Sequence, residues 1–229
     1  MKHWRILTAV AAGLTLSAAT SQAAISLDFG NANAEGIQFN GSASSFQFDP
    51  LSGSIGTPQF QITSEQGGSA AVGLAGWVNN GPWSIGAITV NGTLQTANVT
   101  GTGSLAISDG SGKLLTGNVN WVTIQTSQNA GAVNAGLVVN VGNLAYTGTN
   151  PDLLSFVHQM VAMDVTFQFS PGMTLTQLTT GAGPYTSSFS GSMSGVSGVP
   201  EPTTMLAVTL LVLPFGASAV KIIRKNRTA

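Results

Sequence analysis

The chain has no cysteine among its 229 residues. Disulfide bonds, thiolate catalysis and cysteine-ligated metals are therefore excluded, and the folded part must be stabilised by core packing. Charge is also scarce, because Asp, Glu, Lys and Arg make up 7% of the residues, against roughly 25% in typical globular domains. Hydrophobic residues still reach 43%, so the composition does not suit disorder. Polarity carried by Ser, Thr, Asn and Gln, with 29 glycines, instead indicates an extracellular β-rich protein.

Positive charge is nearly missing from the body of the chain, residues 24–199. Its one base is Lys113. Its acids are Asp28, Glu35, Asp49, Glu65, Asp109, Asp152 and Asp164. A body with one cation has no electrostatic surface for phosphate backbones, so nucleic acid is excluded as a partner.

The N-terminus has the three parts of a secretory signal peptide. Lys2 and Arg5 precede an apolar run from Ile6 to Leu16, and small residues follow at Ser21 and Ala23. The pattern predicts a signal peptide over residues 1–23, cut by signal peptidase between Ala23 and Ala24. The alternative is an uncleaved anchor, for which the apolar run is short.

The C-terminus places a rigid carboxylate, an apolar span and a basic tail in that order. Pro200 and Pro202 hold Glu201 in extended backbone that cannot join a helix, and a lone carboxylate stays outside hydrocarbon. The stretch that follows is uncharged from Thr203 to Val220 and, with Lys221 reaching to the interface, predicts a transmembrane helix over about residues 203–223. The basic residues Lys221, Arg224, Lys225 and Arg227 predict a cytoplasmic tail by the positive-inside rule.

Residues Val199 to Arg227 together resemble the PEP-CTERM sorting signal of Gram-negative bacteria. The resemblance rests on Val199-Pro200-Glu201-Pro202 standing directly before a terminal span and a basic tail. It implies recognition by exosortase, a multispanning membrane enzyme, with cleavage near the motif and delivery of the body to the cell surface or exopolysaccharide matrix. The alternative is a plain tail anchor in which Pro-Glu-Pro occurs by chance.

The body has a hydrophobic period of two. Apolar residues alternate with polar ones in residues 25–29, 37–40, 46–49 and 59–63, and Asn91-Gly92 marks a hairpin. The connections are too short for crossover helices, so the strands should pair antiparallel. The spacing predicts an all-β fold, a β-sandwich of Greek-key or jelly-roll type over residues 24–189. Residues 190–199, rich in Ser and Gly, are expected to be a flexible linker.

One short helix is expected within this body. Asn150 suits the N-cap, Pro151 suits the first helical position, and Asp152 complements the helix dipole. Leu153, Val157, Met160 and Val161 then share a face, which extends the predicted helix to about Met163.

Candidate chemistry is sparse. Carboxylates could form a glycosidase pair, and the acids considered are Glu35, Glu65, Asp49, Asp109, Asp152 and Asp164. His158, the only histidine of the body, has no motif around it and is better interpreted as a helix residue. Asp109-Gly110-Ser111-Gly112 has too few acids for a calcium loop and is interpreted as a tight turn. Neither a metal nor a cofactor is predicted.

Tryptophans supply the remaining candidates. Trp77, Trp83 and Trp121 suit either a sugar-stacking platform or a β-core. Trp83, which follows Asn-Asn-Gly-Pro, is the least core-like of the three.

Two classes of function follow. The first is a non-enzymatic surface or matrix protein, associated with exopolysaccharide or biofilm and anchored in the membrane before processing. The second is a polysaccharide-active enzyme or glycan-binding module on the same anchor.

Overall fold

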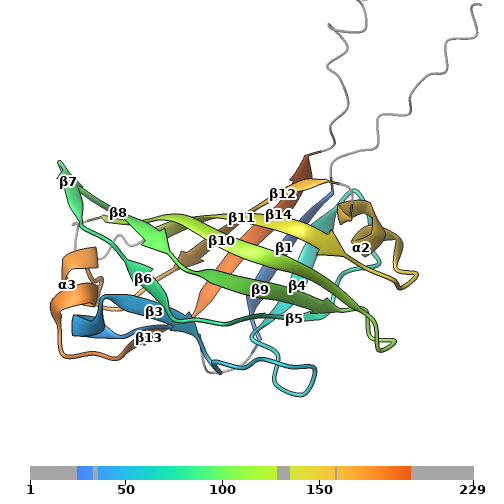
Figure 1. The fold of residues 1–229 in the computed structure, drawn as a ribbon, viewed down its shortest axis with the longest axis horizontal. Helices are drawn as coiled ribbons and strands as arrows, with labels where there is room; N and C mark the ends of the chain where they lie inside the picture. Colours follow the sequence, from blue (N-terminus) through green and yellow to red (C-terminus); the bar gives the residue numbers. More distant parts are fainter. Residues whose placement is uncertain (1–24, 33–35, 128–134, 158, 197–229) are drawn as a thin grey trace, which may run out of the picture. The chain divides into compact units, whose positions relative to one another are not determined.

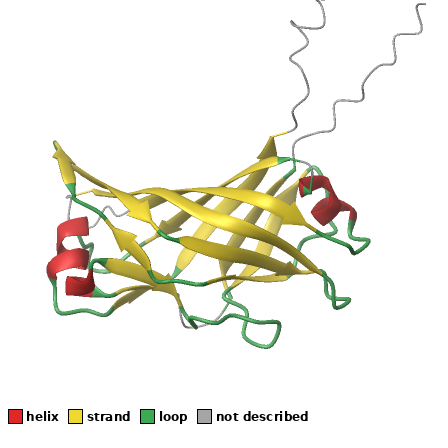
Figure 2. Ribbon diagram, viewed as in Figure 1, coloured by secondary structure: helices red, strands yellow, loops and turns green. Residues whose placement is uncertain are grey.

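The computed structural model describes residues 25–32, 36–127, 135–157 and 159–196 (Figure 1). They lie within one compact unit, Ala24–Gly198. Strands dominate this unit, as Figure 2 shows, so the predicted all-β class is confirmed. The strands are β1 (Ser26–Asn31), β2 (Ile37–Phe39), β3 (Ser45–Phe48), β4 (Phe60–Gln66), β5 (Ala75–Asn79), β6 (Trp83–Ile85), β7 (Thr89–Asn91), β8 (Leu94–Thr100), β9 (Thr102–Ser108), β10 (Leu114–Ser127), β11 (Ala135–Ala145), β12 (Met160–Phe167), β13 (Tyr185–Ser187) and β14 (Phe189–Val196). The helices are the 3-10 helix η2 (Gly41–Ala43) and the α-helices α2 (Pro151–Phe156) and α3 (Leu175–Thr180).

Eight of the strands close into a ring. Their order is β11-β12-β14-β1-β4-β5-β9-β10, and β10 pairs again with β11. The long strand β10 makes closure possible, because it pairs with β9 along Leu114–Asn120 and with β11 along Thr116–Ile124. Every pairing in the described part is antiparallel, as the short connections predicted.

The predicted β-sandwich is therefore wrong, and the fold is a closed eight-stranded barrel. A sandwich and a barrel share the same alternation of inward apolar and outward polar residues. They differ in whether the edge strands meet, which depends on register and coiling across distant strands. Here β10 and β11 meet, so the ring has no open edge.

A second row of strands branches from the barrel. Beyond its contact with β9, β10 pairs with β8 through Thr123–Ser127, and the row continues as β6, β3, β2 and β13. The chain bends between β8 and β9 at Gly101, whose φ of +126° is a backbone conformation that glycine adopts readily. This bend directs β8 and β9 into the two parts of the sheet.

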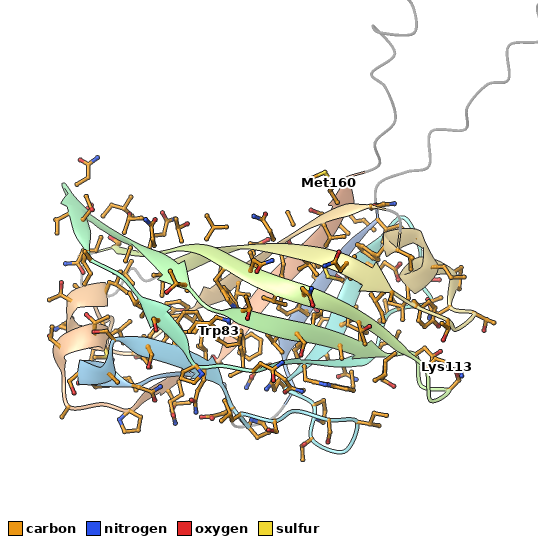
Figure 3. The ribbon with its side chains drawn as sticks, viewed as in Figure 1. Trp83, Lys113 and Met160 are labelled. Carbon is orange, nitrogen blue, oxygen red and sulfur yellow. The ribbon has the colours of Figure 1, made fainter. Side chains whose placement is uncertain are left out.

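Aromatic side chains fill the interior near the branch. Trp83 is fully buried, its ring centroid is 5.3 Å from that of Trp121, and Phe46 and Phe48 pack against both indoles. Figure 3 shows Trp83 among the strands of the sheet. Each such pair contributes about 0.5–1.5 kcal/mol beyond its buried area. The interior at this level is thus a packed core.

The two α-helices lie at opposite ends of the barrel in Figure 1. Helix α2 buries Leu153 and Phe156, and α3 buries Leu175 and Leu178. The start of α2 is as predicted, but its predicted end near Met163 is wrong. The helix stops at Phe156, and Met160 begins β12 with 84% of its side chain exposed (Figure 3).

Helix α3 was not predicted. Its N-cap Thr174 and Gln177 form a reciprocal capping box, a signature that the sequence carries. The N-terminus of α3 is also held by the sheet, because Thr126 Oγ1 accepts a hydrogen bond from the Leu175 N–H (2.7 Å).

The predicted flexible linker over 190–199 is also wrong for most of its length. Residues up to Val196 belong to β14, which pairs with β1 on one side and β12 on the other. Ser190, Ser192 and Ser194 point outward along β14, while its glycines share the inward face with Phe189 and Met193, where neighbouring side chains leave no room for a Cβ. Gly191, for example, lies against the Phe29 ring, where a Cβ would approach the ring atom Cζ to 2.6 Å.

Candidate functional site at the α2 end of the barrel

Two of the candidate acids come together where β4 ends and α2 begins. Ala70 N–H donates to Asp152 Oδ2 (2.5 Å), and Ala71 N–H donates to Glu65 Oε2 (3.1 Å). Both donors belong to the loop between β4 and β5. This loop therefore holds the two carboxyl groups side by side, although they are 87 positions apart in the sequence.

Gly68 covers the pair closely. A Cβ at this position would stand 2.5 Å from Glu65 Oε1 and would also collide with Asp152 Oδ1. Asp152 is buried, and Glu65 Oε1 is a buried atom without a described hydrogen-bond donor. The Asp152 carboxyl also crowds against Gly68, close enough to act on the pKa of Glu65.

Asn150 connects this loop to α2. Its Oδ1 accepts hydrogen bonds from the N–H groups of Asp152 (3.0 Å) and Leu153 (3.1 Å), which caps the helix as the sequence predicts. Its Nδ2 donates to the Ala70 carbonyl oxygen (2.8 Å). One asparagine thus fixes the helix start and the loop that binds both carboxyl groups.

Tyr146 extends the network to the turn between β9 and β10. Its hydroxyl donates to Asp109 Oδ2 (2.8 Å) and accepts from the Asn150 N–H (3.0 Å). Asp109 Oδ1 accepts from the N–H groups of Ser111 (2.7 Å) and Lys113 (3.0 Å). These bonds confirm the tight turn predicted for residues 109–112.

The pKa values of the carboxyl groups at the two ends of this network shift in opposite directions. Burial raises the pKa of Glu65 above its ordinary 4.5; the hydrogen bond from the Ala71 N–H opposes this rise, and Asp152 adds to it. Desolvation also acts to raise the pKa of Asp109, but hydrogen bonds from Tyr146, Ser111 and Lys113 outweigh it and lower that pKa to about 2. Burial, together with the bond to Asp109, raises the pKa of Tyr146. Glu65 therefore retains its proton to higher pH than an ordinary glutamic acid, while Asp109 remains ionised in acid.

The other candidate acids lie apart from this pair. Asp49 follows β3, and its Oδ1 accepts from Gln47 Nε2 (3.4 Å). Asp164 is on the outer face of β12, where Ser192 Oγ donates to it (2.5 Å). Glu35 and His158 lie outside the described residues.

The tryptophans do not form an exposed platform. Trp77, Trp83 and Trp121 are all buried, so the core interpretation is confirmed for each. The proposal that Trp83 is the least core-like is wrong, since it is 0% exposed. Gly101 and Gly103 make room for its indole: a Cβ on either would come within 2.8 Å of an indole carbon.

The described residues hold no group of three or more His, Asp or Glu arranged to bind a metal ion. In the same part of the chain, no helix has the length and hydrophobicity to cross a bilayer. The predicted transmembrane helix over 203–223, the motif Val199–Pro202, the basic tail and the Ala23–Ala24 junction all lie outside the described residues.

Comparison of the chain with protein-family models, curated proteins and solved structures gives no match. The sequence did not predict that Glu65 and Asp152 would meet, or that Tyr146 would connect them to Asp109. The visible signals were the Asn-Pro-Asp start of the helix and the glycine pair two residues after Glu65.

Proposed function

We propose that the chain is an exported bacterial surface or matrix protein that carries a PEP-CTERM sorting signal. Signal peptidase removes residues 1–23, and exosortase acts at Val199–Pro202 while the span over 203–223 holds the precursor in the inner membrane. The observation that carries this proposal is the order of the C-terminal segments: Pro-Glu-Pro, an uncharged apolar run, and four basic residues within the last nine.

The barrel supports a non-enzymatic role for the exported body. Its interior is packed with side chains, and its outer face is rich in Ser, Thr and Asn with few charges. Such a surface can exchange hydrogen bonds with a hydrated polysaccharide without strong ionic attraction to other partners. We therefore propose association with exopolysaccharide or biofilm after export.

A polysaccharide-active enzyme is the second candidate, and the Glu65–Asp152 pair is the observation that favours it. A glutamic acid with a raised pKa is a candidate general acid. Glycosidase carboxyl groups, however, stand about 5–9.5 Å apart so that a sugar or water fits between them. Here an oxygen of each carboxyl group lies within 2.5 Å of a single point, the place of a Cβ on Gly68, so the two groups stand closer together than a glycosidase pair. This geometry favours a structural role.

The localisation proposal is tested by intact mass and cell fractionation in a host that has exosortase. We expect a surface or medium form that lacks both residues 1–23 and the segment after the motif. Replacing Pro200 and Pro202 by Ala should leave a longer form in the inner membrane. The matched control changes Pro50 and Pro58, which flank an exposed loop of the barrel. If the parent protein at the surface still carries the segment after Val199–Pro202, the proposal is contradicted.

The enzyme candidate is tested separately by a glycan-hydrolysis screen of the full chain. Hydrolysis abolished by both Glu65→Gln and Asp152→Asn, with Asp164→Asn unaffected, would favour the enzyme. A parent chain without hydrolysis of any screened glycan leaves the non-enzymatic proposal as the better one.

A further inference from the structure

An uncharged hollow lies on the outer face of the barrel near the branch of the sheet. Its volume is about 460 Å³, within the range of small-molecule pockets. It is lined by Asn80, Thr102, Gly103, Ser104, Asn118 and Asn120. The hollow belongs to a different part of the barrel from the carboxyl pair, since none of its residues takes part in that network.

The pairing of β9 with β10 forms one wall of the hollow. Thr102 lies opposite Asn120, and Ser104 lies opposite Asn118. These positions alternate with inward Gly103 and Val119, so all four polar side chains point to the same outer face. Directly opposed residues in antiparallel strands are about 4.5–5.5 Å apart, which places hydroxyl and amide groups at spacings that one ligand can bridge.

The turn after β5 forms the other wall. Asn80 adopts a left-handed conformation with φ of +72°, which asparagine tolerates better than most residues. Its Nδ2 donates to Ser104 Oγ (3.1 Å), so both side chains are oriented before a ligand arrives. Gly103 lies at the bottom, where a Cβ would stand 2.5 Å from Cζ2 of Trp83. The buried indole therefore keeps this position free of a side chain.

The remaining polar groups are available. Thr102, Asn118 and Asn120 are exposed, and the side-chain hydrogen bonds of the described residues do not engage them. Each asparagine amide offers two donors and an acceptor, and the threonine hydroxyl offers one donor and two lone pairs. The hollow thus presents mixed donors and acceptors and no charge.

We propose that this hollow binds a short segment of a neutral, hydroxyl-rich oligosaccharide. The inference rests on the proposed function, because it assigns the polysaccharide contact of the exported body to specific residues. An anionic glycan would require cations, and Lys113, the one base of the described residues, lies on the turn that follows β9 (Figure 3). An apolar ligand would leave the amides unpaired, which costs free energy when they are desolvated. Sugar hydroxyls satisfy both requirements.

The experiment uses the full chain in detergent micelles and isothermal titration with cellohexaose, maltohexaose and, as an anionic probe, oligogalacturonate. We expect binding of at least one neutral hexasaccharide and weak or absent binding of oligogalacturonate. The double variant Asn118→Ala/Asn120→Ala should bind at least fivefold more weakly, and the near-isosteric Thr102→Val should also weaken binding. Asn98→Ala, at an exposed strand asparagine outside the hollow, is the matched control and should bind like the parent.

The outcomes separate this inference from the proposed function. If the parent binds neither neutral probe, or binds only oligogalacturonate, the inference is overturned. If it binds a neutral probe and the hollow variants bind equally well, the site is elsewhere and the inference is again overturned. Export and C-terminal processing are scored independently in cells, so their failure would overturn the proposed function whatever the binding result. Thermal unfolding of each variant shows whether lost binding reflects an unfolded protein.

Discussion

At the scale of single residues, Glu65 gives the protein a pH dependence of known sign. Its pKa is raised in the folded protein by burial and by Asp152, so the folded state holds the proton more tightly than the unfolded chain. The stability from this group is fully present below its unfolded pKa, near 4.5, and declines as the pH rises through the raised folded value.

We therefore predict that Glu65→Gln makes the protein more stable at pH 7–8 than the parent. The amide is neutral at all pH values and can donate to Asp152, a bond that contributes about 1 kcal/mol. Such a change raises the midpoint of thermal unfolding by about 2–4 °C, and the advantage should shrink toward pH 4. The measurement is thermal unfolding by circular dichroism from pH 4 to pH 8. Asp164→Asn, on the exposed face of β12, is the control, and parallel pH profiles for Glu65→Gln and the parent would contradict the prediction.

Trp83 is the second residue whose role can be measured directly. Because it is fully buried among aromatic rings, Trp83→Ala should lower the free energy of unfolding by about 3–5 kcal/mol. Gly103→Val should also destabilise, since its side chain would collide with the indole. Urea unfolding followed by far-UV circular dichroism tests both variants. Asn98→Ala is the control and should leave the urea midpoint unchanged. If Trp83→Ala also leaves the midpoint unchanged, the indole is not part of the core.

At the scale of elements, the sequence predicted the first residue of helix α2 but not its last. The start of α2 was predictable because Asn150, Pro151 and Asp152 act locally on the first turn. The end was not, because Val161 fits a helical face and a strand equally well. In the structure Val161, Met163, Val165 and Phe167 are buried at every second position, between β11 and β14. Pairing with β11 and β14 therefore selected the strand period of two over the helical period of 3.6.

Asn150 connects two elements, so its substitution tests their coupling. Asn150→Ala removes the N-cap and the bond to the Ala70 carbonyl. We predict a loss of about 1–2 kcal/mol in the free energy of unfolding and faster hydrogen exchange at the Ala70 and Ala71 N–H groups. Asn150→Ser restores a cap but not the contact with Ala70, so it should recover stability while the exchange remains fast. Unchanged exchange in both variants would show that the loop holds the carboxyl groups without help from α2.

At the scale of the whole molecule, closure of the barrel lay beyond the sequence. Alternation placed Leu27, Phe29, Phe60 and Ile62 inside, and each is buried. The register of β10 with β11 also shifts between Trp121 and Thr123. The meeting of β10 with β11, and of Glu65 with Asp152, depends on strand register over long sequence separations, which no local pattern records.

The extent of β14 has a consequence for the proposed processing. Val196 pairs with Met160, and Gly195 N–H donates to the Ile25 carbonyl oxygen (3.1 Å). Only residues 197–199 separate this strand from Pro200. Three residues span at most about 11 Å, so an enzyme that cuts at Val199 has at most about that length of chain between the cut and the last paired residue of β14.

We predict that eight Gly and Ser residues inserted after Gly198 speed C-terminal processing severalfold. The longer tether removes steric interference by the barrel and leaves the motif, the span and the basic tail unchanged. The rate is measured by pulse-chase and intact mass in exosortase-containing cells. The same insertion in the exposed loop between β3 and β4, next to Ile55, controls for added length and should leave the rate at the parent value. An equal rate for both insertions and the parent would mean that the enzyme tolerates the short tether or that β14 detaches before the cut, and hydrogen exchange along β14 in the precursor distinguishes these two cases.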